Sequence, residues 1–234
     1  MRLHRFFIEE TVGNAKNIVI NNEQLIHQWK KVFRYAPGDS VIVFDNSGYE
    51  YTASIEYIEG AEARLIVTHE EQKPLSTKRE VYLFVSITKK DTFEWILEKA
   101  TELGVDRVIP LISERSEKKD LNFERAKKII IEASEQSGRV ILPRLYEIAT
   151  LTDALTHYDI PKAAFDPTGS AFITSASGVP TEGPFAVYIG PEGGWSPKEL
   201  ELFRANKTPV YSLGTQVLRA ETAAIAVLSL LLLR

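Results

Sequence analysis

The sequence contains no cysteine and only four histidines in 234 residues. Without cysteine, disulfide bonds, thiolate nucleophiles, Cys-ligated zinc and iron–sulfur clusters are excluded. The histidines are scattered, without the H-x-x-x-H spacing that places two ligands on one face of a helix; they are His4, His27, His69 and His157. The sequence therefore predicts neither covalent thiol chemistry nor a metal site.

Long apolar runs are also missing. The first ten residues have no apolar core of the length that a signal peptide needs. The longest apolar stretch, residues 223–234, is shorter than the about 20 residues that span a bilayer. We therefore expect a cytoplasmic protein with no membrane partner, and we expect this apolar stretch to be buried in a core or an interface.

A net positive charge is absent as well. The formal net charge is −4, which gives no overall attraction for a polyanion, so a nucleic acid would have to bind at a local basic patch. Charged residues make up 26% and hydrophobic residues 44% of the chain, as in ordinary soluble globular proteins. The length allows one large domain or two modest ones.

The first part of the chain is rich in alternating, β-type runs. Turn signals containing Pro, Gly, Asn and Asp separate these runs, which predicts a small β-barrel with one helix at residues 21–33. Residues 70–80 are polar, contain a proline and lack periodicity. We place the domain boundary there, which gives domains at residues 1–72 and 73–234.

From residue 81 onward, apolar strand-like runs alternate with helical patterns. This order predicts an α/β fold with a mostly parallel sheet, in which ligands bind beyond the carboxyl ends of the strands. Strands are expected at residues 81–87, 105–112, 162–166, 184–189 and 209–214, and helices at residues 91–104, 121–138, 196–206 and 223–234.

Capping residues mark the ends of several predicted helices. Asp91 is expected to be an N-cap, with Glu94 completing a capping box. Ser196 is expected to cap a helix whose first turn contains Pro197. Gly138 is expected to end the helix that precedes it.

The segment "GPEGG", residues 190–194, follows a predicted strand. It matches neither the phosphate-binding P-loop nor the G-x-G-x-x-G dinucleotide fingerprint. Glu192 would place a negative charge where a phosphate binds, so a neutral or cationic ligand fits the loop better. An ordinary tight turn explains these glycines about equally well.

A second strand-to-helix segment, "LGTQVLRAETA" at residues 213–223, occupies an equivalent position. By itself it could be a capped helix, in which Glu221 and Thr222 satisfy the N-terminal amides and Arg219 is a surface charge. Because both segments follow strands of one predicted sheet, we expect them to line a common pocket.

Four motifs occur together in a specific order: "ATELGV", "SEQSGR", "IGPEGGWS" and "LGTQVLRAETA". With this order and spacing, the chain resembles the ribosomal RNA small-subunit methyltransferase E family of the SPOUT superfamily over nearly its whole length. The N-terminal segments "HRFF", "HQWKKVFR" and "PGDSVIVFD" are similar to the PUA-like RNA-binding domain of that family.

The resemblance implies a PUA-like β-barrel followed by a SPOUT α/β domain with a C-terminal trefoil knot, an exception to the rule that chains are unknotted. It further implies a homodimer with active sites at the interface. S-adenosylmethionine would be bound in the knot, largely by backbone groups, and the activity would be methylation of N3 of one uridine in small-subunit (16S) rRNA. The cofactor-binding residues would be Ile189, Gly190, Gly193, Gly194, Ser212, Leu213, Gly214, Val217 and Leu218.

The residues themselves agree with this chemistry. Methylation of uracil at C5 ordinarily requires a thiolate that adds at C6, and a chain without cysteine cannot provide it. Nitrogen or the ribose oxygen remains as the acceptor. A sulfonium-bearing cofactor without phosphate is also compatible with a glycine loop that carries Glu192.

Arg219 and Glu221 are the candidate catalytic residues. The N3 proton of uridine is about as weakly acidic as a lysine ammonium, with a pKa of roughly 9 to 10, so it has to leave before or during transfer. Arg219 is expected to donate to a uracil carbonyl and stabilise the developing anion. Glu221 is a candidate base or orienting group, and as a base it would need burial to raise its pKa. A helix N-terminal carboxylate is an equally good explanation.

For RNA binding, basic residues near aromatic ones suit phosphate contact and base stacking. The candidate contacts are Arg2, Arg5, Lys30, Lys31 and Arg34, with Phe6, Phe7 and Trp29 nearby. Alternatively, one of the two phenylalanines is simply a core residue. Because residues 1–72 hold more acidic than basic residues, such a patch would have to be one-sided.

Two positions depart from the family pattern: Gln216 replaces a basic residue, and Phe33 replaces a leucine. The loss of charge at Gln216 puts its RNA or cofactor contact in doubt. Other functions remain open: a SPOUT enzyme that methylates a ribose 2′-hydroxyl or a tRNA base, or a non-catalytic RNA-binding ribosome-assembly factor. A dehydrogenase is disfavoured because the dinucleotide fingerprint is missing.

Overall fold

The computed structural model describes residues 3–73, 79–173 and 177–233. By its contacts the chain divides into two units. The first comprises Met1–Leu75 with Ser134–Leu142, and the second Ser76–Ala133 with Pro143–Arg234. Arg2, one of the candidate RNA contacts, lies outside the described residues.

The first unit is built on a five-stranded sheet with the order β1-β3-β4-β5-β2. The β1–β3 pair is parallel and the other pairs are antiparallel. Short turns join β3 to β4 and β4 to β5, as antiparallel neighbours allow. Its elements are β1 (Arg5–Phe7), β2 (Asn17–Ile20), α1 (Glu23–Gln28), the π-helix η1 (Trp29–Phe33), β3 (Ser40–Phe44), β4 (Tyr49–Glu59) and β5 (Glu62–Gln72).

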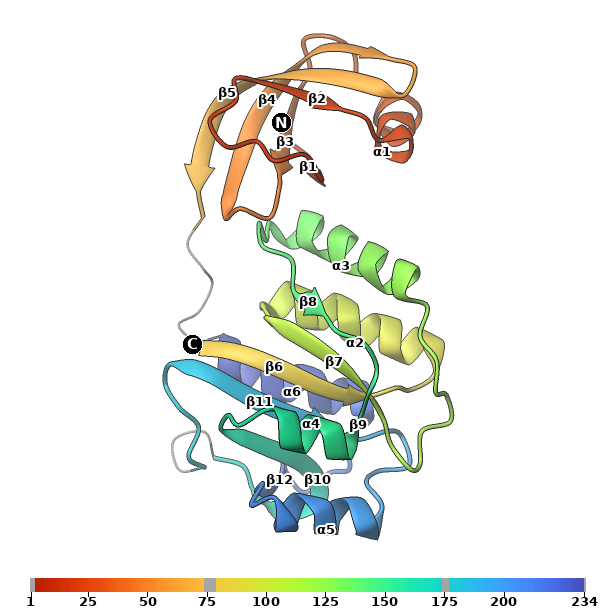
Figure 1. Cartoon of the computed structure of the whole chain (residues 1–234), viewed down its shortest axis with the longest axis vertical. Coiled ribbons are helices and arrows are strands. Elements are labelled where there is room, and N and C mark those ends of the chain that lie inside the picture. The colour runs from red at the N-terminus through yellow and green to blue at the C-terminus, as the bar shows by residue number, and fades with distance from the viewer. Residues whose placement is uncertain (1–2, 74–78, 174–176, 234) are drawn as a thin grey trace. The chain divides into compact units, whose positions relative to one another are not determined.

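The second unit contains a parallel sheet with the order β12-β10-β11-β6-β7-β8, and β9 also pairs with β7 (Figure 1). Every strand pair in this sheet is parallel, which confirms the α/β prediction. The strands are β6 (Arg79–Ser86), β7 (Arg107–Ile112), β8 (Arg144–Leu145), β9 (Ala149–Thr150), β10 (Lys162–Ala171), β11 (Gly183–Ile189) and β12 (Val210–Ser212).

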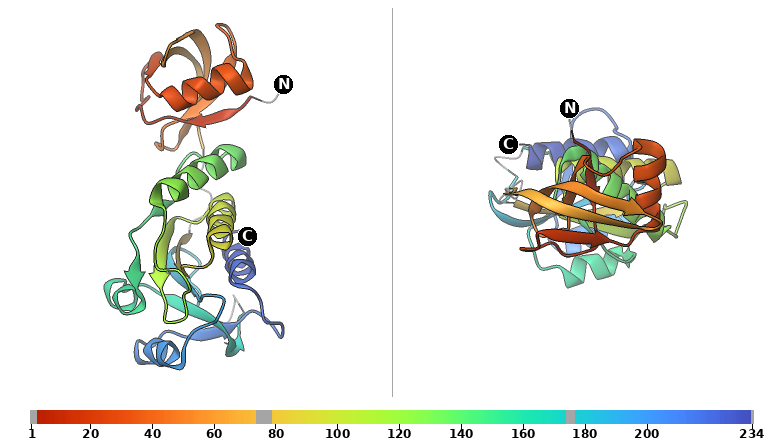
Figure 2. Two further views of the ribbon diagram at one scale, coloured as in Figure 1. Left: turned by 90° about the vertical axis from the view of Figure 1, so that its right-hand side faces the viewer. Right: turned by 90° about the horizontal axis from the view of Figure 1, so that it is seen from above.

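Helices cover both faces of this sheet. One core contains side chains of α2, α3 and α6, and the other contains side chains of α4 and α5. Helices α2 and α6 are in contact and run side by side in both Figures 1 and 2. The helices are α2 (Lys90–Leu103), α3 (Phe123–Ser137), α4 (Leu151–His157), α5 (Pro197–Ala205) and α6 (Ala220–Leu232).

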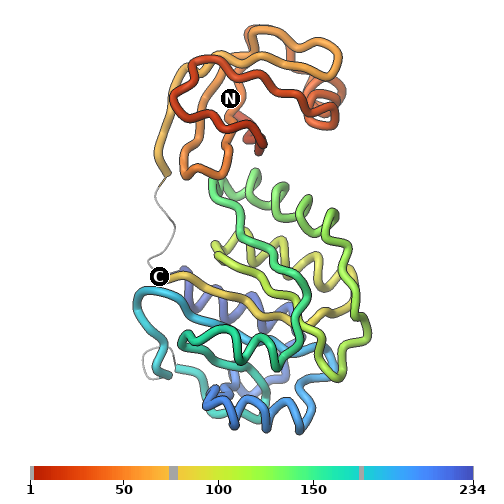
Figure 3. The backbone as a smooth tube through the Cα atoms, in the orientation of Figure 1, coloured from red at the N-terminus to blue at the C-terminus, as the bar shows by residue number. Residues whose placement is uncertain are grey.

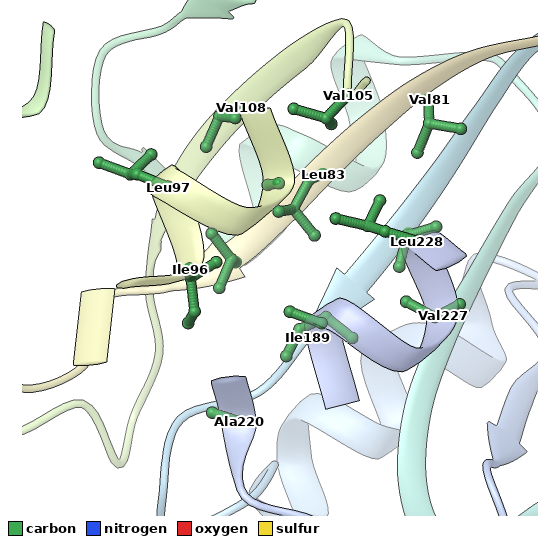
Figure 4. Close-up of a cluster of buried hydrophobic side chains, with 14 of the residues drawn as sticks. Val81, Leu83, Ile96, Leu97, Val105, Val108, Ile189, Ala220, Val227 and Leu228 are labelled. Carbon is green, nitrogen blue, oxygen red and sulfur yellow. The ribbon is translucent and has the colours of Figure 1, made fainter. Parts of the chain in front are cut away.

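The alternation of side chains along the central strands explains why both faces are covered. On β6, Val81 and Leu83 point to the α2/α6 side, whereas Tyr82 and Phe84 belong to the α4/α5 side. Figure 4 shows aliphatic side chains of α2 and α6 meeting over β6 and β11. A strand segment buried on both faces is expected to be a continuous apolar run, as residues 81–85 of β6 are.

The start of α2 differs from the prediction. The N-cap is Lys89, which makes no side-chain capping bond, and Asp91 lies inside the first turn. The Glu94 carboxylate bonds to Arg125 of α3 instead of to the helix N-terminus. The predicted capping box at Asp91 was therefore wrong, because a tertiary ion pair takes the side chain that would have completed it.

The other caps are confirmed. Ser196 and Glu199 form a reciprocal capping box at α5, with proline at its start. Gly138 follows α3 with a φ of +78° and donates its amide to the carbonyl of Ser134.

The sequence analysis missed β2, β8, β9 and α4, all of which are short. The path after β11 leads through α5 and β12 into α6, as the chain trace shows (Figure 3). No helix within the described residues is long and apolar enough to cross a membrane.

Candidate functional site

A cavity of about 360 Å³ opens where β10, β11 and β12 end or turn. Most of its lining comes from three segments, namely residues 165–168 of β10, the loop after β11, and the loop after β12. Arg115, Leu200, Ala220 and Ala223 complete it. Because these strands are parallel neighbours, their following loops meet at one edge of the sheet. The expectation that the two glycine-containing loops share a pocket is confirmed.

The glycines of the first loop are required for different reasons. A Cβ on Gly190 would lie 3.2 Å from the indole of Trp195, and one on Gly193 would lie 3.2 Å from Cβ of Arg115. Gly194 has a φ of +68°, which disfavours other residues. The close approaches that the glycines permit are therefore partly made by protein side chains.

The second loop is open to solvent. Residues 214–217 are all exposed, and Val217 retains 79% of its accessible surface although it lines the cavity. The hydroxyl of Ser212 donates to the carbonyl of Gly214 at 2.7 Å, which fixes the first turn of the loop.

Most of the predicted cofactor residues line this cavity. The lining includes Ile189, Gly190, Gly193, Gly194, Ser212, Leu213, Val217 and Leu218. Gly214 is not part of the lining; its φ of +148° and its bond to Ser212 give it a place in the turn. Gln216 also lines the cavity. Which of these residues contact a ligand remains a prediction.

The glycine loop is fastened to the start of α2. The Glu192 carboxylate accepts the backbone N–H of Lys89 at 3.0 Å. Because Lys89 precedes the first turn of α2, this bond joins the loop after β11 to the loop after β6. Glu192 thus has a structural contact in addition to any electrostatic effect on a ligand.

Glu199 connects a third loop to the same region. It is 4% exposed, and its two carboxylate oxygens accept the amides of Ser196 at 2.7 Å and of Glu114 at 2.9 Å. Ser196 begins α5, and Glu114 lies in the loop after β7. A buried carboxylate that accepts two backbone donors in this way holds both loops in place.

The candidate catalytic residues border the cavity without lining it. Arg219 is the N-cap of α6 and is exposed, and it stands between Leu218 and Ala220, which do line the cavity. Glu221 is half-buried in the first turn of α6.

The candidate RNA contacts of the first unit are not equivalent. Arg5 is half-buried and pairs with Glu50 at 3.2 Å. Lys30, Lys31 and Arg34 are exposed. The three exposed residues lie on and directly after η1, so they form a local basic segment.

The expected aromatic partners differ from the prediction. Trp29 is fully buried and Phe6 is 2% exposed, so neither is available for base stacking. They pack edge to face at 5.2 Å in the core of the first unit. The idea that these two rings stack on RNA was wrong, because the short strand and the π-helix both direct an aromatic ring inward.

Several lining residues were missed, chiefly Arg115, Asp166, Thr168 and Trp195. Asp166 and Thr168 belong to "FDPTG", a turn-like segment that directly follows the buried part of β10. Its place after a predicted strand could have marked it. Arg115 lies in a polar loop without a motif, and no local pattern marks it.

The described residues contain no group of three or more His, Cys, Asp or Glu side chains that could hold a metal ion. The cavity therefore depends on backbone groups, apolar side chains and a few charges.

Comparison with known proteins relates this site to a family. The sequence model of the RNA methyltransferase domain family matches residues 75–232 of this chain. Ribosomal RNA small subunit methyltransferase E of Rickettsia conorii is 30% identical over 98% of this chain and 95% of its own length. The protein of the same name from Synechocystis is 31% identical over 92% of this chain and 76% of its own length.

Solved structures agree with the sequence matches. The structure of ribosomal RNA small subunit methyltransferase E from Neisseria gonorrhoeae bound to S-adenosyl methionine is similar, with a TM-score of 0.86 and 26% identity over 98% of this chain and 96% of that one. A Legionella pneumophila protein in complex with the bound cofactor SAM gives a TM-score of 0.89 and 29% identity, over 99% of this chain and 97% of that one.

Proposed function

The chain belongs to the RNA methyltransferase family and, within it, to the ribosomal RNA small-subunit methyltransferase E family, and from this premise we propose that it methylates N3 of a uridine in small-subunit (16S) rRNA, with S-adenosylmethionine as the donor. The observation that carries the proposal is the cavity in which the loops after β11 and β12 meet. These are the two segments that resemble the family's cofactor-binding motifs.

The residues present fit S-adenosylmethionine. The cavity is of ligand size, and its walls combine backbone groups with apolar side chains such as Ile189 and Leu218. The charged lining residues are one arginine and two carboxylates, which suit a ligand with a cationic and a zwitterionic part better than a polyphosphate. When bound there, the cofactor supplies an activated methyl group.

Arg219 is proposed to stabilise the charge that develops on uracil as its N3 proton leaves. A guanidinium beside a carbonyl oxygen is effective where water is excluded. Arg219 is exposed in this chain alone, but it adjoins Leu218 and Ala220 of the cavity wall, so a uridine entering there meets it.

Glu221 is proposed as an orienting residue in preference to a base. It lies in the first turn of α6, next to Arg219, and a carboxylate is in general a poor acceptor for the proton of so weak an acid as the uridine N3 group. As an acceptor it can hold Arg219 or a substrate donor in position.

The finer fold is also part of the proposal: a PUA-like RNA-binding domain at residues 1–72 and a SPOUT domain at residues 73–234 with a C-terminal trefoil knot. A close crossing of the chain supports the knot. Tyr211 of β12 pairs with both Phe165 and Ser170 of β10, so the residues between them bulge out of the ladder beside β12. A Cβ on Gly169 would lie within 2.7 Å of the Tyr211 backbone, which shows how tightly the two segments cross.

We further propose that Lys30, Lys31 and Arg34 contact the phosphates of the rRNA, and that the protein acts in the cytoplasm as a homodimer. The exposed basic segment on η1 supports the first statement. Exposed apolar side chains on α2 and α6, Trp95 and Leu230, support the second.

The test is a transfer assay. The protein is incubated with S-adenosylmethionine labelled in the methyl group and with small ribosomal subunits from a strain that lacks the modification. The rRNA is then digested and the labelled nucleoside is identified. We expect label in 3-methyluridine.

Variants connect the activity to the site. Arg219→Ala should lower the single-turnover rate by about 100- to 1,000-fold, whereas Arg204→Ala, an exposed arginine in the last turn of α5, should leave it unchanged. Label in a 2′-O-methyl nucleoside would contradict the proposed acceptor. Cofactor binding without transfer to subunits or naked rRNA would contradict the substrate and direct the search to tRNA.

A further inference from the structure

Arg115 lies in the loop after β7, outside the four motifs on which the resemblance to the family rests. Its Nη1 donates to the carbonyl of Gly193 at 2.8 Å and to that of Trp195 at 3.3 Å. The aliphatic part of the side chain lies so close to Gly193 that a Cβ there would come within 3.2 to 3.4 Å of it. Arg115 is therefore anchored on the glycine loop by one nitrogen and by packing.

The other two guanidinium nitrogens of Arg115, Nε and Nη2, are available to a ligand. Among the described residues, no acceptor bonds to Nε or Nη2 of Arg115, although the residue lines the cavity. These two nitrogens form the side edge of the guanidinium, which offers parallel donors to a carboxylate or a phosphate. Arg115 is also the only basic residue among the described residues that line the cavity.

A carboxylate with one oxygen available to a ligand lines the same cavity. Asp166 uses Oδ1 to accept the amide and the hydroxyl of Thr168, at 2.9 and 2.6 Å. Its Oδ2 bonds to no described residue and is 3.9 Å from the position of a Cβ on Gly194. Glu192, the remaining charged lining residue, is held by the amide of Lys89. One free cationic edge and one free carboxylate oxygen thus flank the glycine loop, which is the charge pattern complementary to an α-amino acid.

We propose that Arg115 binds the α-carboxylate, and Asp166 the α-ammonium group, of the methionyl part of S-adenosylmethionine. The inference rests on the proposed function, because it assigns residues to that cofactor. It adds a specific role: these two side chains distinguish the complete cofactor from nucleosides that lack the amino-acid end. An RNA phosphate is the competing ligand for Arg115.

Calorimetric titration with truncated ligands tests this assignment. S-Adenosylhomocysteine and its decarboxylated analogue both lack the sulfonium charge and differ only in the carboxylate. The wild type should bind S-adenosylhomocysteine about 10- to 100-fold more tightly than the analogue. In Arg115→Ala this ratio should fall to within about 3-fold, and Arg115→Lys, which keeps the charge without the fork, should give an intermediate ratio.

The same design applies to the ammonium group. Asp166→Asn should reduce the preference for S-adenosylhomocysteine over its deaminated analogue and leave the preference over the decarboxylated analogue intact. Lys198→Ala serves as the matched control, because Lys198 is an exposed neighbouring cation that pairs with Glu114 and does not line the cavity. It should change neither ratio.

Other outcomes would contradict the assignment of Arg115 to the carboxylate. Equal weakening of both ligands by Arg115→Ala would assign the residue to loop support alone. Unchanged binding of S-adenosylhomocysteine together with weaker RNA binding would assign it to a phosphate. Thermal unfolding of each variant identifies a loss of fold, in which case the Arg115→Lys ratios decide. If the wild type did not bind S-adenosylhomocysteine at all, the proposed function would be overturned as well. The outcomes above concern only the role of Arg115, so the two kinds of failure are distinguishable.

Discussion

Gly169 illustrates how single positions constrain the cofactor-binding unit. A Cβ at this residue would lie 2.6 to 2.7 Å from three backbone atoms of Tyr211, and a backbone cannot move aside as a flexible side chain can. We expect Gly169→Ala to lower the free energy of unfolding by about 2 to 3 kcal/mol and to weaken binding of S-adenosylmethionine, because the displaced Tyr211 precedes the lining residue Ser212. Urea unfolding and calorimetry measure the two effects.

Ser170→Ala is the matched control, since Ser170 is the exposed neighbour of Gly169 and its substitution adds no atom near Tyr211. It should change stability by less than about 0.5 kcal/mol. Wild-type stability of Gly169→Ala would show that β10 and β12 can separate without cost, and it would remove the support that this crossing gives to the knot.

Tyr188 gives the second unit a dependence on alkaline pH. Its ring is fully buried and stacks on Phe84 at 4.5 Å, and its hydroxyl donates to the carbonyl of Ala154. Burial raises the pKa of Tyr188 above the roughly 10 of a tyrosine in water. Above pH 10 the unfolded chain therefore loses this proton while the folded chain keeps it, so the contribution is present below pH 10 and declines as the pH rises.

Tyr188→Phe should remove that decline. We expect its free energy of unfolding to fall less steeply than that of the wild type between pH 10 and 11, by up to about 1.4 kcal/mol per pH unit. The variant should also be less stable at neutral pH by about 1 kcal/mol, because the Ala154 carbonyl loses its donor. Urea titrations at several pH values measure both, and parallel curves for the two proteins would contradict the argument.

At the scale of residues, the sequence predicted the site through its backbone and missed its charges. The glycines of the loop after β11 were recognisable because glycine tolerates close approach and positive φ, which are properties of the residue itself. Arg115 and Asp166 reach the cavity only because β7 and β10 bring their loops to the same edge of the sheet. That placement depends on strand order, which local sequence does not encode.

At the scale of elements, η1 presents two adjacent lysines to solvent. Trp29 is buried in the core, and this fixes the orientation of the segment, so that Lys30 and Lys31 are exposed. The double variant Lys30→Ala/Lys31→Ala should weaken binding to small-subunit rRNA and reduce the salt dependence of log K by about 2, one for each lost phosphate contact. Filter binding at several salt concentrations measures both.

Two further variants serve as controls for the double variant. Lys16→Ala removes an exposed lysine from another part of the first unit and should leave the salt dependence unchanged. Arg5→Ala should chiefly lower stability, because it leaves the buried carboxylate of Glu50 with one ionic partner fewer. An unchanged salt dependence in the double variant would show that η1 does not contact RNA.

The elements that the sequence predicted correctly are the long or strongly patterned ones. The central parts of β6 and β11 are continuous apolar runs because both faces are covered, and α5 carries its own capping box. The missed strands β8 and β9 have two residues each, and their pairing depends on β7. Asp91 was misjudged because Glu94 finds a stronger partner in Arg125, and such competition between a cap and a tertiary contact is invisible along the chain.

At the scale of the whole molecule, the apolar C-terminal helix α6 is buried on one side and exposes apolar side chains on the other. One side of α6 is buried among β6, β11 and α2, which satisfies the expectation that the segment is a core element. The other side leaves Leu230 43% and Leu233 65% exposed, and the neighbouring α2 leaves Trp95 43% exposed. Exposed apolar side chains on two adjacent helices are typical of a face that another protein covers.

Leu230→Glu tests whether that protein is a second copy of this chain. The wild type should sediment as a dimer at micromolar concentration, and the variant as a monomer, because a carboxylate placed in an apolar interface has no partner there. If the active site needs residues from both copies, methyl transfer should fall together with dimerisation. The exposed residue Thr152 on α4, on the opposite face of the sheet, provides the control Thr152→Glu, which should remain dimeric and active. A wild type that is monomeric at all concentrations, or a fully active monomeric Leu230→Glu, would confine the catalytic site to a single chain.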